Sequence, residues 1–408
     1  MRPMWARLRL DIGTWDLLAG LAACAGAGDA PGRAGRVEAL WSAAGDAIAF
    51  LSARSGLDAL LAALDLPRGS EVLVSALTIP DMPAIVAQHG LVPVALDLDP
   101  TTLAPSAADL RAAAGPRTRA LVVAHLFGGV ADLDPLRRAA RERGLVVLED
   151  CAQAYAADGW RGEPESDAAL FSFGPIKTAT AGGGALLRVR SPELRERVRA
   201  VQAAWPLQGR RDQARRLARL LLLKGLAARP AFGALQALAR LRGRDLDEFL
   251  AGAARSFAGR ELMPALRRRP GAALLALLER RLRRPPRARA AARAAIGERV
   301  RAGLPAGFEL AGAAAPRRAH WVVPLSVRDP ERLVADLRRA GFDATRRSSL
   351  VALEPAARAR ALLEHLVFVP AGPELGERGL ARLLSALARS AALLPAPAVR
   401  PPQRAARS

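Results

Sequence analysis

Lysine and asparagine are the residues that this chain most clearly lacks. Among its 61 basic residues only Lys177 and Lys224 are lysines, and the 408 residues include no asparagine. Arginine replaces lysine wherever a positive charge alone is needed, but a guanidinium with a pKa above about 12 cannot supply the unprotonated amine that attacks a carbonyl. A lysine kept in such a composition is therefore a candidate for covalent chemistry.

The chain is also poor in cysteine and in long uninterrupted apolar runs. Its two cysteines, Cys24 and Cys151, lie far apart, which argues against a disulfide framework or a cysteine-based metal site and favours a reducing, cytoplasmic compartment. Asp11 and Asp16 interrupt the only stretch, 1–30, that resembles a signal peptide. The sequence contains no run of about 20 uncharged apolar residues, so no membrane-spanning helix is predicted.

Positive charge is concentrated in one quarter of the chain. Residues 201–300 hold 23 basic and 7 acidic residues, which is +16 of the total net charge of +22. Two interpretations remain open: solvated helix faces, or a surface for anionic partners such as nucleotide-sugar phosphates or acidic lipid. Nucleic acid is disfavoured, because no aromatic residues interleave the arginines. The leucine-rich faces of helices expected in 210–300 could rest on an anionic membrane surface.

Strand-like and helix-like segments alternate along residues 71–189. Strands with near-continuous apolar runs, separated by helices, predict a mostly parallel α/β sheet. Ligands of such sheets gather at the carboxyl ends of the strands, where Thr78, His125 and Asp150 are expected.

The pattern along the chain predicts five segments, and it predicts a helix over Val37–Phe50. The segments are an N-terminal segment 1–35, a large domain 36–205, a basic helical segment 206–300, a small C-terminal α/β domain 301–394 and a disordered tail 395–408.

Lys177 follows the segment Phe171-Ser172-Phe173-Gly174-Pro175-Ile176 and precedes three consecutive glycines, 182–184. Asp150 ends a strand-like run 27 residues before Lys177. A lysine that forms a Schiff base and an upstream acid at the pyridine nitrogen are the two fixed points of a pyridoxal phosphate site. The alternatives are that Lys177 is an ordinary surface lysine and that Asp150 caps the N-terminus of a helix.

Three groups of segments, in this order, resemble the DegT/DnrJ/EryC1/StrS family of sugar aminotransferases. They are Pro93–Pro100 with Gly115–Ala120 and His125–Gly128, then Glu149–Ala154, then Phe171–Lys177 with the glycines that follow. The resemblance runs from about Val37 to Val189, and more loosely beyond Trp321. It implies a fold-type-I pyridoxal phosphate enzyme with a large domain, a smaller C-terminal α/β domain, and active sites between the two subunits of a homodimer.

The resemblance also implies roles for individual residues. Lys177 would hold pyridoxal 5′-phosphate and move a proton during catalysis, and Asp150 would keep the ring nitrogen protonated. Further cofactor contacts are expected from the turn at Arg54-Ser55, from Ile79, from Gln153 and from Ser172. His125 is expected to be a hydrogen-bonded structural histidine and Cys151 a small buried residue.

The chain departs from the family at three places. Ala53-Arg54 replaces the usual Gly-Thr of the phosphate turn, and Ile79 stands where many members place an aromatic residue over the ring. No Asn-x-Arg segment follows the lysine loop, because the chain has no asparagine. A guanidinium at Arg54 could replace the lost hydroxyl through a charge-assisted contact.

The resemblance therefore implies a cytoplasmic aminotransferase that moves an amino group, typically from glutamate, to a keto group of a nucleotide-linked sugar in polysaccharide or secondary-metabolite biosynthesis. Two alternatives remain. One is another pyridoxal phosphate reaction, such as dehydration, against which the retention of Lys177 weighs. The other is a non-catalytic binding or regulatory protein on the same scaffold, which the altered phosphate turn and the missing Asn-x-Arg segment favour.

Overall fold

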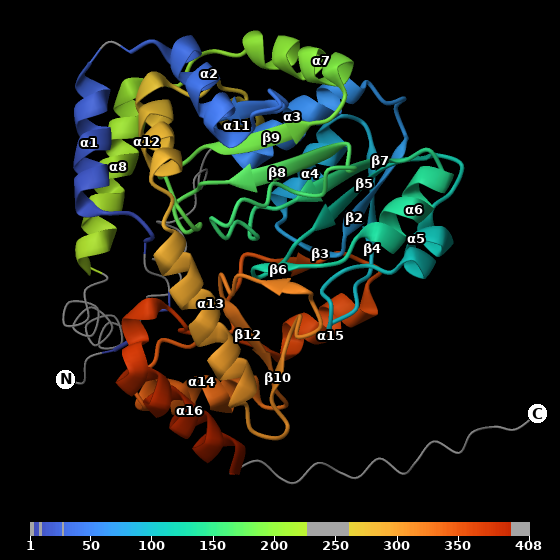
Figure 1. Ribbon diagram of the computed structural model, residues 1–408. Helices are drawn as coiled ribbons and strands as arrows, with labels where there is room; N and C mark the ends of the chain where they lie inside the picture. Colours follow the sequence, from blue (N-terminus) through green and yellow to red (C-terminus); the bar gives the residue numbers. More distant parts are fainter. Residues whose placement is uncertain (1–3, 8–9, 27, 227–260, 393–408) are drawn as a thin grey trace, which may run out of the picture.

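The computed structural model of the chain describes residues 4–7, 10–26, 28–226 and 261–392. Its larger part contains a seven-stranded sheet of order β1-β9-β8-β7-β5-β2-β4 (Figure 1). Strands β4, β2, β5, β7 and β8 are parallel, and β9 and β1 pair antiparallel. The predicted α/β class with a mostly parallel central sheet is confirmed. The strands are β1 (Ala47–Phe50), β2 (Glu71–Ser75), β4 (Val92–Leu96), β5 (Thr118–Ala124), β7 (Val146–Asp150), β8 (Ala168–Ser172) and β9 (Ala185–Val189).

The inner strands are apolar on both faces, so helices cover the sheet on both sides. Val72 and Val74 pack on one face and Leu73 on the other, because successive side chains of a strand alternate. The first face carries α3 (Ala53–Leu64), α4 (Asp81–Gln88) and α7 (Pro192–Ala203), with the short α11 (Leu262–Leu266) beside α3. The second face carries α5 (Ala107–Ala113) and α6 (Asp134–Glu142).

The N-terminal helices and part of the basic segment complete the second face. Trp41 packs edge-on against Phe171 of β8, with ring centroids 4.9 Å apart, in a core cluster to which five helices contribute. The five helices are α1 (Thr14–Ala25), α2 (Ala30–Trp41), α8 (Arg210–Leu226), α12 (Ala272–Arg283) and α13 (Arg287–Ala302). Within the described residues, no helix combines the length and the apolarity needed to cross a bilayer.

Helix α13 (Arg287–Ala302) leads into a smaller part built on a three-stranded antiparallel sheet, β10-β12-β14 (Figure 1). Two short ladders join the two parts: β11 (Arg317–Arg318) with β6 (Gly129–Val130), and β13 (Val351–Ala352) with β3 (Leu77–Thr78). The remaining elements are β10 (Glu309–Leu310), β12 (Val323–Ser326), β14 (Leu366–Val369), α14 (Pro330–Arg339), α15 (Ala357–His365), the 3-10 turn η1 (Pro373–Leu375) and α16 (Gly376–Ala392).

The helix predicted over Val37–Phe50 is wrong in its second half. Helix α2 ends at Trp41, Gly45 turns the chain with φ +67°, and Ala47–Phe50 forms strand β1. All four residues of β1 are buried and pair with β9, so tertiary pairing overrides their helical spacing. The tail expected at 395–408, and residues 227–260 of the basic segment, lie outside the described residues.

Candidate active site

Lys177 lies in a tight loop between β8 and β9. The Lys177 N–H donates to the Gly174 carbonyl at 3.0 Å, and the Lys177 carbonyl accepts from the Thr180 N–H at 3.2 Å. Gly182 and Gly184 adopt positive φ angles, which glycine tolerates without strain, as the chain returns antiparallel to β8. The loop thus fixes the lysine backbone just past the carboxyl end of β8.

The Lys177 amine is held in conditions that favour its neutral form. Burial lowers its pKa to about 8; the Asp150 carboxyl opposes this shift and the nearby Arg54 guanidinium adds to it. The amine lies 4.2 Å from the centroid of the Trp321 ring, and the Trp321 indole N–H donates to the Ile176 carbonyl at 2.9 Å. A large fraction of Lys177 is therefore an unprotonated nucleophile at mildly alkaline pH.

Asp150 lies at the carboxyl end of β7, on the strand next to β8. Burial raises the pKa of its carboxyl, against the hydrogen bond from the Ala152 N–H at 3.0 Å and the positive charge of Lys177. Asp150 and Lys177 interact electrostatically, yet among the ion pairs of the described residues none joins them.

The donor set around Lys177 and Asp150 fits a pyridoxal phosphate site. Burial is the main cause of both pKa shifts, although each side chain keeps partial solvent exposure. A lysine amine and a carboxyl are the two groups that such a cofactor requires. Their contact with opposite sides of one ring stays a prediction.

The phosphate turn expected at Arg54-Ser55 forms the N-terminus of α3. Ser52 caps the helix by accepting the Ser55 N–H at 3.2 Å, and Arg54 forms an ion pair with Asp81. Because the Arg54 charge lowers the pKa of Lys177, the guanidinium and the helix N-terminus lie near the amine. This is a suitable place for an anion.

The contacts of Ser55 support the turn and give no support to its expected place among the cofactor ligands. Its hydroxyl is fully buried, donates to the Leu266 carbonyl at 2.8 Å and lies 2.9 Å from the Ser52 hydroxyl.

The other expected cofactor residues border the same end of the sheet. Ser172 ends β8, and its hydroxyl accepts from the Gly174 N–H at 3.4 Å. The Gln153 side-chain carbonyl accepts from the Phe127 N–H at 2.8 Å, which anchors a residue with φ +57°. Ile79 is half-buried and packs against apolar cores on two sides. Their contacts with a cofactor stay predictions.

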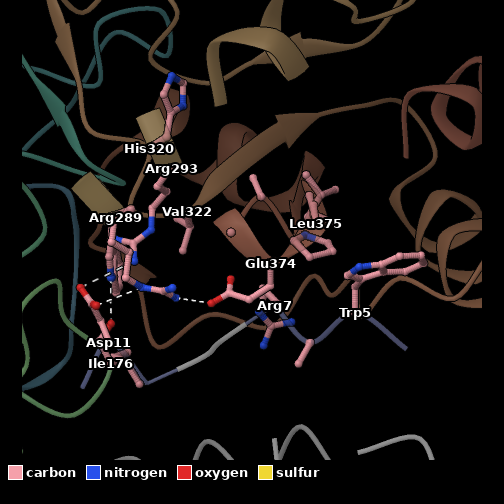
Figure 2. A pocket seen from close by; sticks show the side chains of 16 residues that line it. Trp5, Arg7, Asp11, Ile176, Arg289, Arg293, His320, Val322, Glu374 and Leu375 are labelled. Carbon is pink, nitrogen blue, oxygen red and sulfur yellow. Dashed lines mark hydrogen bonds and ion pairs between the residues drawn. The ribbon is translucent and has the colours of Figure 1, made fainter. Parts of the chain in front are cut away.

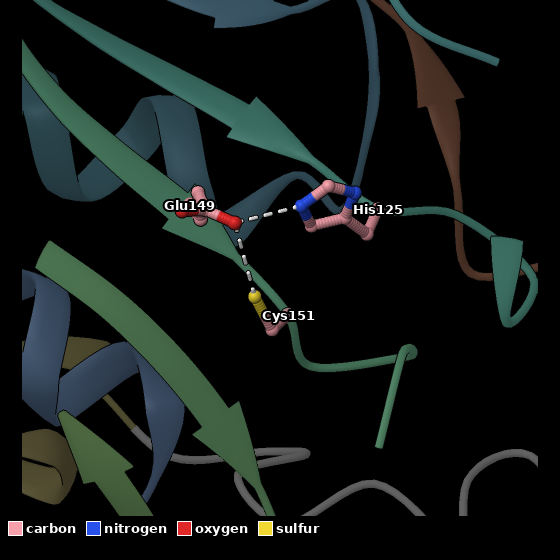
Figure 3. A group of neighbouring side chains, drawn as sticks. All are labelled: His125, Glu149 and Cys151. Carbon is pink, nitrogen blue, oxygen red and sulfur yellow. Dashed lines mark hydrogen bonds and ion pairs between the residues drawn. The ribbon is translucent and has the colours of Figure 1, made fainter. Parts of the chain in front are cut away.

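His125, Glu149 and Cys151 form a buried cluster beneath the site (Figure 3). His125 Nε2 lies 3.0 Å from Glu149 Oε2, and His125 Nδ1 accepts from the Ala131 N–H at 3.4 Å, which assigns the proton to Nε2. Burial raises the pKa of the Cys151 thiol well above its ordinary value. His125 is thus hydrogen-bonded and buried and Cys151 is buried, as expected, and their structural roles stay predictions.

Residues outside the expected motifs also border the lysine loop. A cavity beside Ile176 is lined by Asp11 of the N-terminal segment, by Arg293 of α13 and by Trp321 (Figure 2). The sequence analysis named Trp321 only as the point beyond which the family resemblance is looser, and Asp11 only as a charge that interrupts a stretch like a signal peptide. It did not single out Arg293. The sequence separation of these residues from Lys177, in a chain rich in arginine, left no local signal.

Comparisons with known proteins agree with this geometry. The sequence model of the DegT/DnrJ/EryC1/StrS aminotransferase family matches residues 37–222. GDP-perosamine synthase of Caulobacter vibrioides is 35% identical over 159 residues, which cover 38% of this chain and 43% of the relative. L-glutamine:2-deoxy-scyllo-inosose aminotransferase of Streptoalloteichus tenebrarius is 37% identical over 156 residues, which cover 37% of each protein.

A solved structure shares the fold over nearly the whole chain. The aminotransferase TlmJ from Streptoalloteichus hindustanus superposes with a TM-score of 0.71 and 21% identity, covering 95% of this chain and 99% of that chain. At this identity the likeness concerns the fold alone. The curated relatives, by contrast, are matched over only 32% to 43% of their own length.

Lys177 should react as a free amine at mildly alkaline pH. Because only the neutral amine attacks an aldehyde, the rate at which added pyridoxal phosphate attaches to the cofactor-free protein should rise with pH and level off above about pH 8. Stopped-flow absorbance across a pH series measures this rate, and Lys177→Ala corrects for other amines. A rate that still climbs steeply near about pH 10, the ordinary range of lysine, contradicts the assigned pKa.

Arg54 should contribute to the retention of an anionic cofactor group. Arg54→Ala should weaken the binding of pyridoxal phosphate about 10- to 100-fold, because a charge-assisted hydrogen bond is worth ~1.5–3 kcal/mol. Equilibrium dialysis measures the change. The matched control is Arg117→Ala, which removes an arginine paired with Glu71 at the opposite end of β2. Equal affinities of both variants would remove Arg54 from the site.

Proposed function

We propose that this chain, whose residues 37–222 match the sequence model of the DegT/DnrJ/EryC1/StrS aminotransferase family, is a pyridoxal phosphate-dependent aminotransferase. The observation that carries the proposal is the pair of Lys177 and Asp150 at the carboxyl ends of neighbouring strands, each with its pKa shifted by burial. Titratable groups whose pKa values are shifted by burial and by each other are typical of active sites.

The residues of this chain would divide the work of holding pyridoxal phosphate. Lys177 would attach it covalently, Asp150 would hold the proton on the ring nitrogen, and Arg54 with the N-terminus of α3 would receive the phosphate. When bound, the cofactor supplies an electron sink for the amino-acid carbon. Lys177, whose pKa of about 8 leaves part of its amine unprotonated, would also carry the proton that is moved during the transfer.

The proposed substrates are a nucleotide-linked keto sugar as acceptor and glutamate as donor. The names of two matched relatives support this class: one is a GDP-perosamine synthase, and the other an L-glutamine:2-deoxy-scyllo-inosose aminotransferase. Polysaccharide or secondary-metabolite biosynthesis is the corresponding pathway class. We further propose a homodimer, as the family resemblance implies.

We also propose that the protein rests on an anionic membrane surface through helices α1 and α8. These helices pack antiparallel: the Arg210 side chain donates to the Gly26 carbonyl at 2.9 Å, and Gly20 faces Leu217. Trp15 and Leu222 therefore lie at the same end of the pair (Figure 1).

The exposed face of this helix pair suits a lipid interface. Trp15, Leu18 and Leu222 are 79%, 39% and 63% exposed, and they are three of the six exposed large apolar side chains among the described residues. Exposed Arg211, Arg215 and Arg219 stand one turn apart along α8 and supply the cations that an anionic headgroup layer attracts.

Spectroscopy on four proteins tests the enzymatic proposal. The wild type should show the absorbance band of lysine-bound pyridoxal phosphate at the short-wavelength end of the visible range, and added glutamate should remove this band. Lys177→Ala should lose the band, while Lys224→Ala, the only other lysine substitution available, should keep it. Asp150→Asn should keep the band but react with glutamate about 10²–10³-fold more slowly, because a stabilising charge is gone. A band that no amino donor changes would favour the non-catalytic alternative.

Vesicle sedimentation tests the membrane proposal. At low salt the protein should bind vesicles that contain acidic lipid and ignore purely zwitterionic ones. The double variant Trp15→Ala, Leu222→Ala should bind about tenfold or more weakly, because each buried apolar side chain contributes ~1.5–3 kcal/mol. Val92→Ala, which removes an exposed apolar side chain from β4, is the control. Absence of binding to acidic vesicles rules the proposal out.

A further inference from the structure

The backbone just after Lys177 is held in an unfavourable conformation. Ala179 has φ +55°, a left-handed value that costs an alanine about 1–2 kcal/mol, and it is fully buried. Such a conformation persists only where surrounding contacts fix it. The contacts that fix it here come from outside the large sheet.

Asp11, from the N-terminal segment, accepts the N–H of Ala179. The distance from that nitrogen to Asp11 Oδ2 is 3.0 Å, although the two residues lie 168 positions apart. Asp11 is only 5% exposed, so its charge requires partners. This bond connects a buried carboxylate to the second residue after Lys177.

Three arginines surround Asp11 and complete what we call the N-terminal clasp. Arg289 Nε lies 3.0 Å from Oδ1, Arg293 Nη2 lies 3.8 Å from Oδ2, and Arg281 donates to the Asp11 backbone carbonyl at 2.6 Å. Figure 2 shows Arg289 and Arg293 converging on Asp11. The buried carboxylate is thereby neutralised and oriented.

The clasp holds the lysine loop at a second point. Arg293 Nη1 donates to the Thr178 hydroxyl at 2.9 Å, so the two residues that follow Lys177 are each tied to the same group of side chains. Arg289 also pairs with Glu374 of η1, which extends the connection to the smaller part of the molecule. The N-terminal segment, α13 and the smaller part thus share one set of contacts with the lysine loop.

We propose that Asp11 is a positioning residue that fixes the loop carrying Lys177. It does not touch the reacting amine; it acts by holding Ala179 in its left-handed conformation and by orienting Arg293 toward Thr178. The proposal rests on the proposed function only in that Lys177 is the reacting amine. Without the clasp, Ala179 relaxes, the loop loosens, and water reaches the Lys177 amine.

The test follows the loop itself and needs no cofactor. In full-length protein, Asp11→Ala should accelerate hydrogen exchange at the Ala179 amide ~10-fold or more, since a charge-assisted bond is lost. Competitive acetylation at a series of pH values, read by mass spectrometry, measures how the reactivity of Lys177 depends on pH. The midpoint of this Lys177 profile should move from about pH 8 towards the ordinary lysine range, with Lys224 as an internal reference. Asp11→Asn retains an acceptor for the Ala179 N–H and should shift both readouts less.

The control is Asp29→Ala. Asp29 lies in the same N-terminal region and caps α2 by accepting the Gly32 N–H at 2.9 Å, but among the described residues it contacts neither the clasp nor the lysine loop. This variant should alter thermal stability without moving the Ala179 exchange or the Lys177 profile. Should Asp11→Ala fail to fold, the same two measurements on Asp11→Asn decide.

The clasp proposal is overturned if both Asp11 variants leave the exchange and the acetylation profile at wild-type values. It is also overturned if Asp29→Ala changes them equally. Failure of the proposed function would look different: the wild type would bind no pyridoxal phosphate, while the effects of Asp11 on the loop remained.

Discussion

Burying the Lys177 amine and the Asp150 carboxyl removes both groups from water. The lost hydration free energy of their charged forms must be offset by other interactions in the structure. Desolvation alone would push both groups towards neutrality, which the shifted pKa values of the two side chains reflect. Their mutual attraction offsets part of that cost, although no ion pair joins them among the described residues. The proposed cofactor would contact both groups.

The fold places these groups through its strand topology. Lys177 and Asp150 follow neighbouring parallel strands, β8 and β7, so their side chains emerge at one edge of the sheet. The N-terminus of α3 brings Arg54 to the same edge, and Trp321 reaches it from the smaller part. Distant segments therefore meet around one amine.

The sequence allowed the sheet and the central pair to be predicted, because these depend on local patterns. Buried apolar runs identify β5 and β7. Lys177 stands out because Lys224 is the only other lysine in a chain whose remaining Lys and Arg positions are all arginine. Strand β1 escaped prediction because Ala47–Phe50 has no helix-breaking residue within it, and only pairing with β9 makes it a strand. Asp11 and Trp321 escaped because their roles arise from tertiary contacts far from Lys177 in sequence.

The most direct test is to trap the covalent link chemically. The chain has only two lysines, so borohydride reduction of the protein with pyridoxal phosphate, followed by peptide mass spectrometry, gives an unambiguous location. The account predicts one reduced cofactor per chain, attached to Lys177, and loss of that label in Lys177→Ala. A label found on Lys224 or on the terminal amine, with Lys177 unmodified, would contradict it.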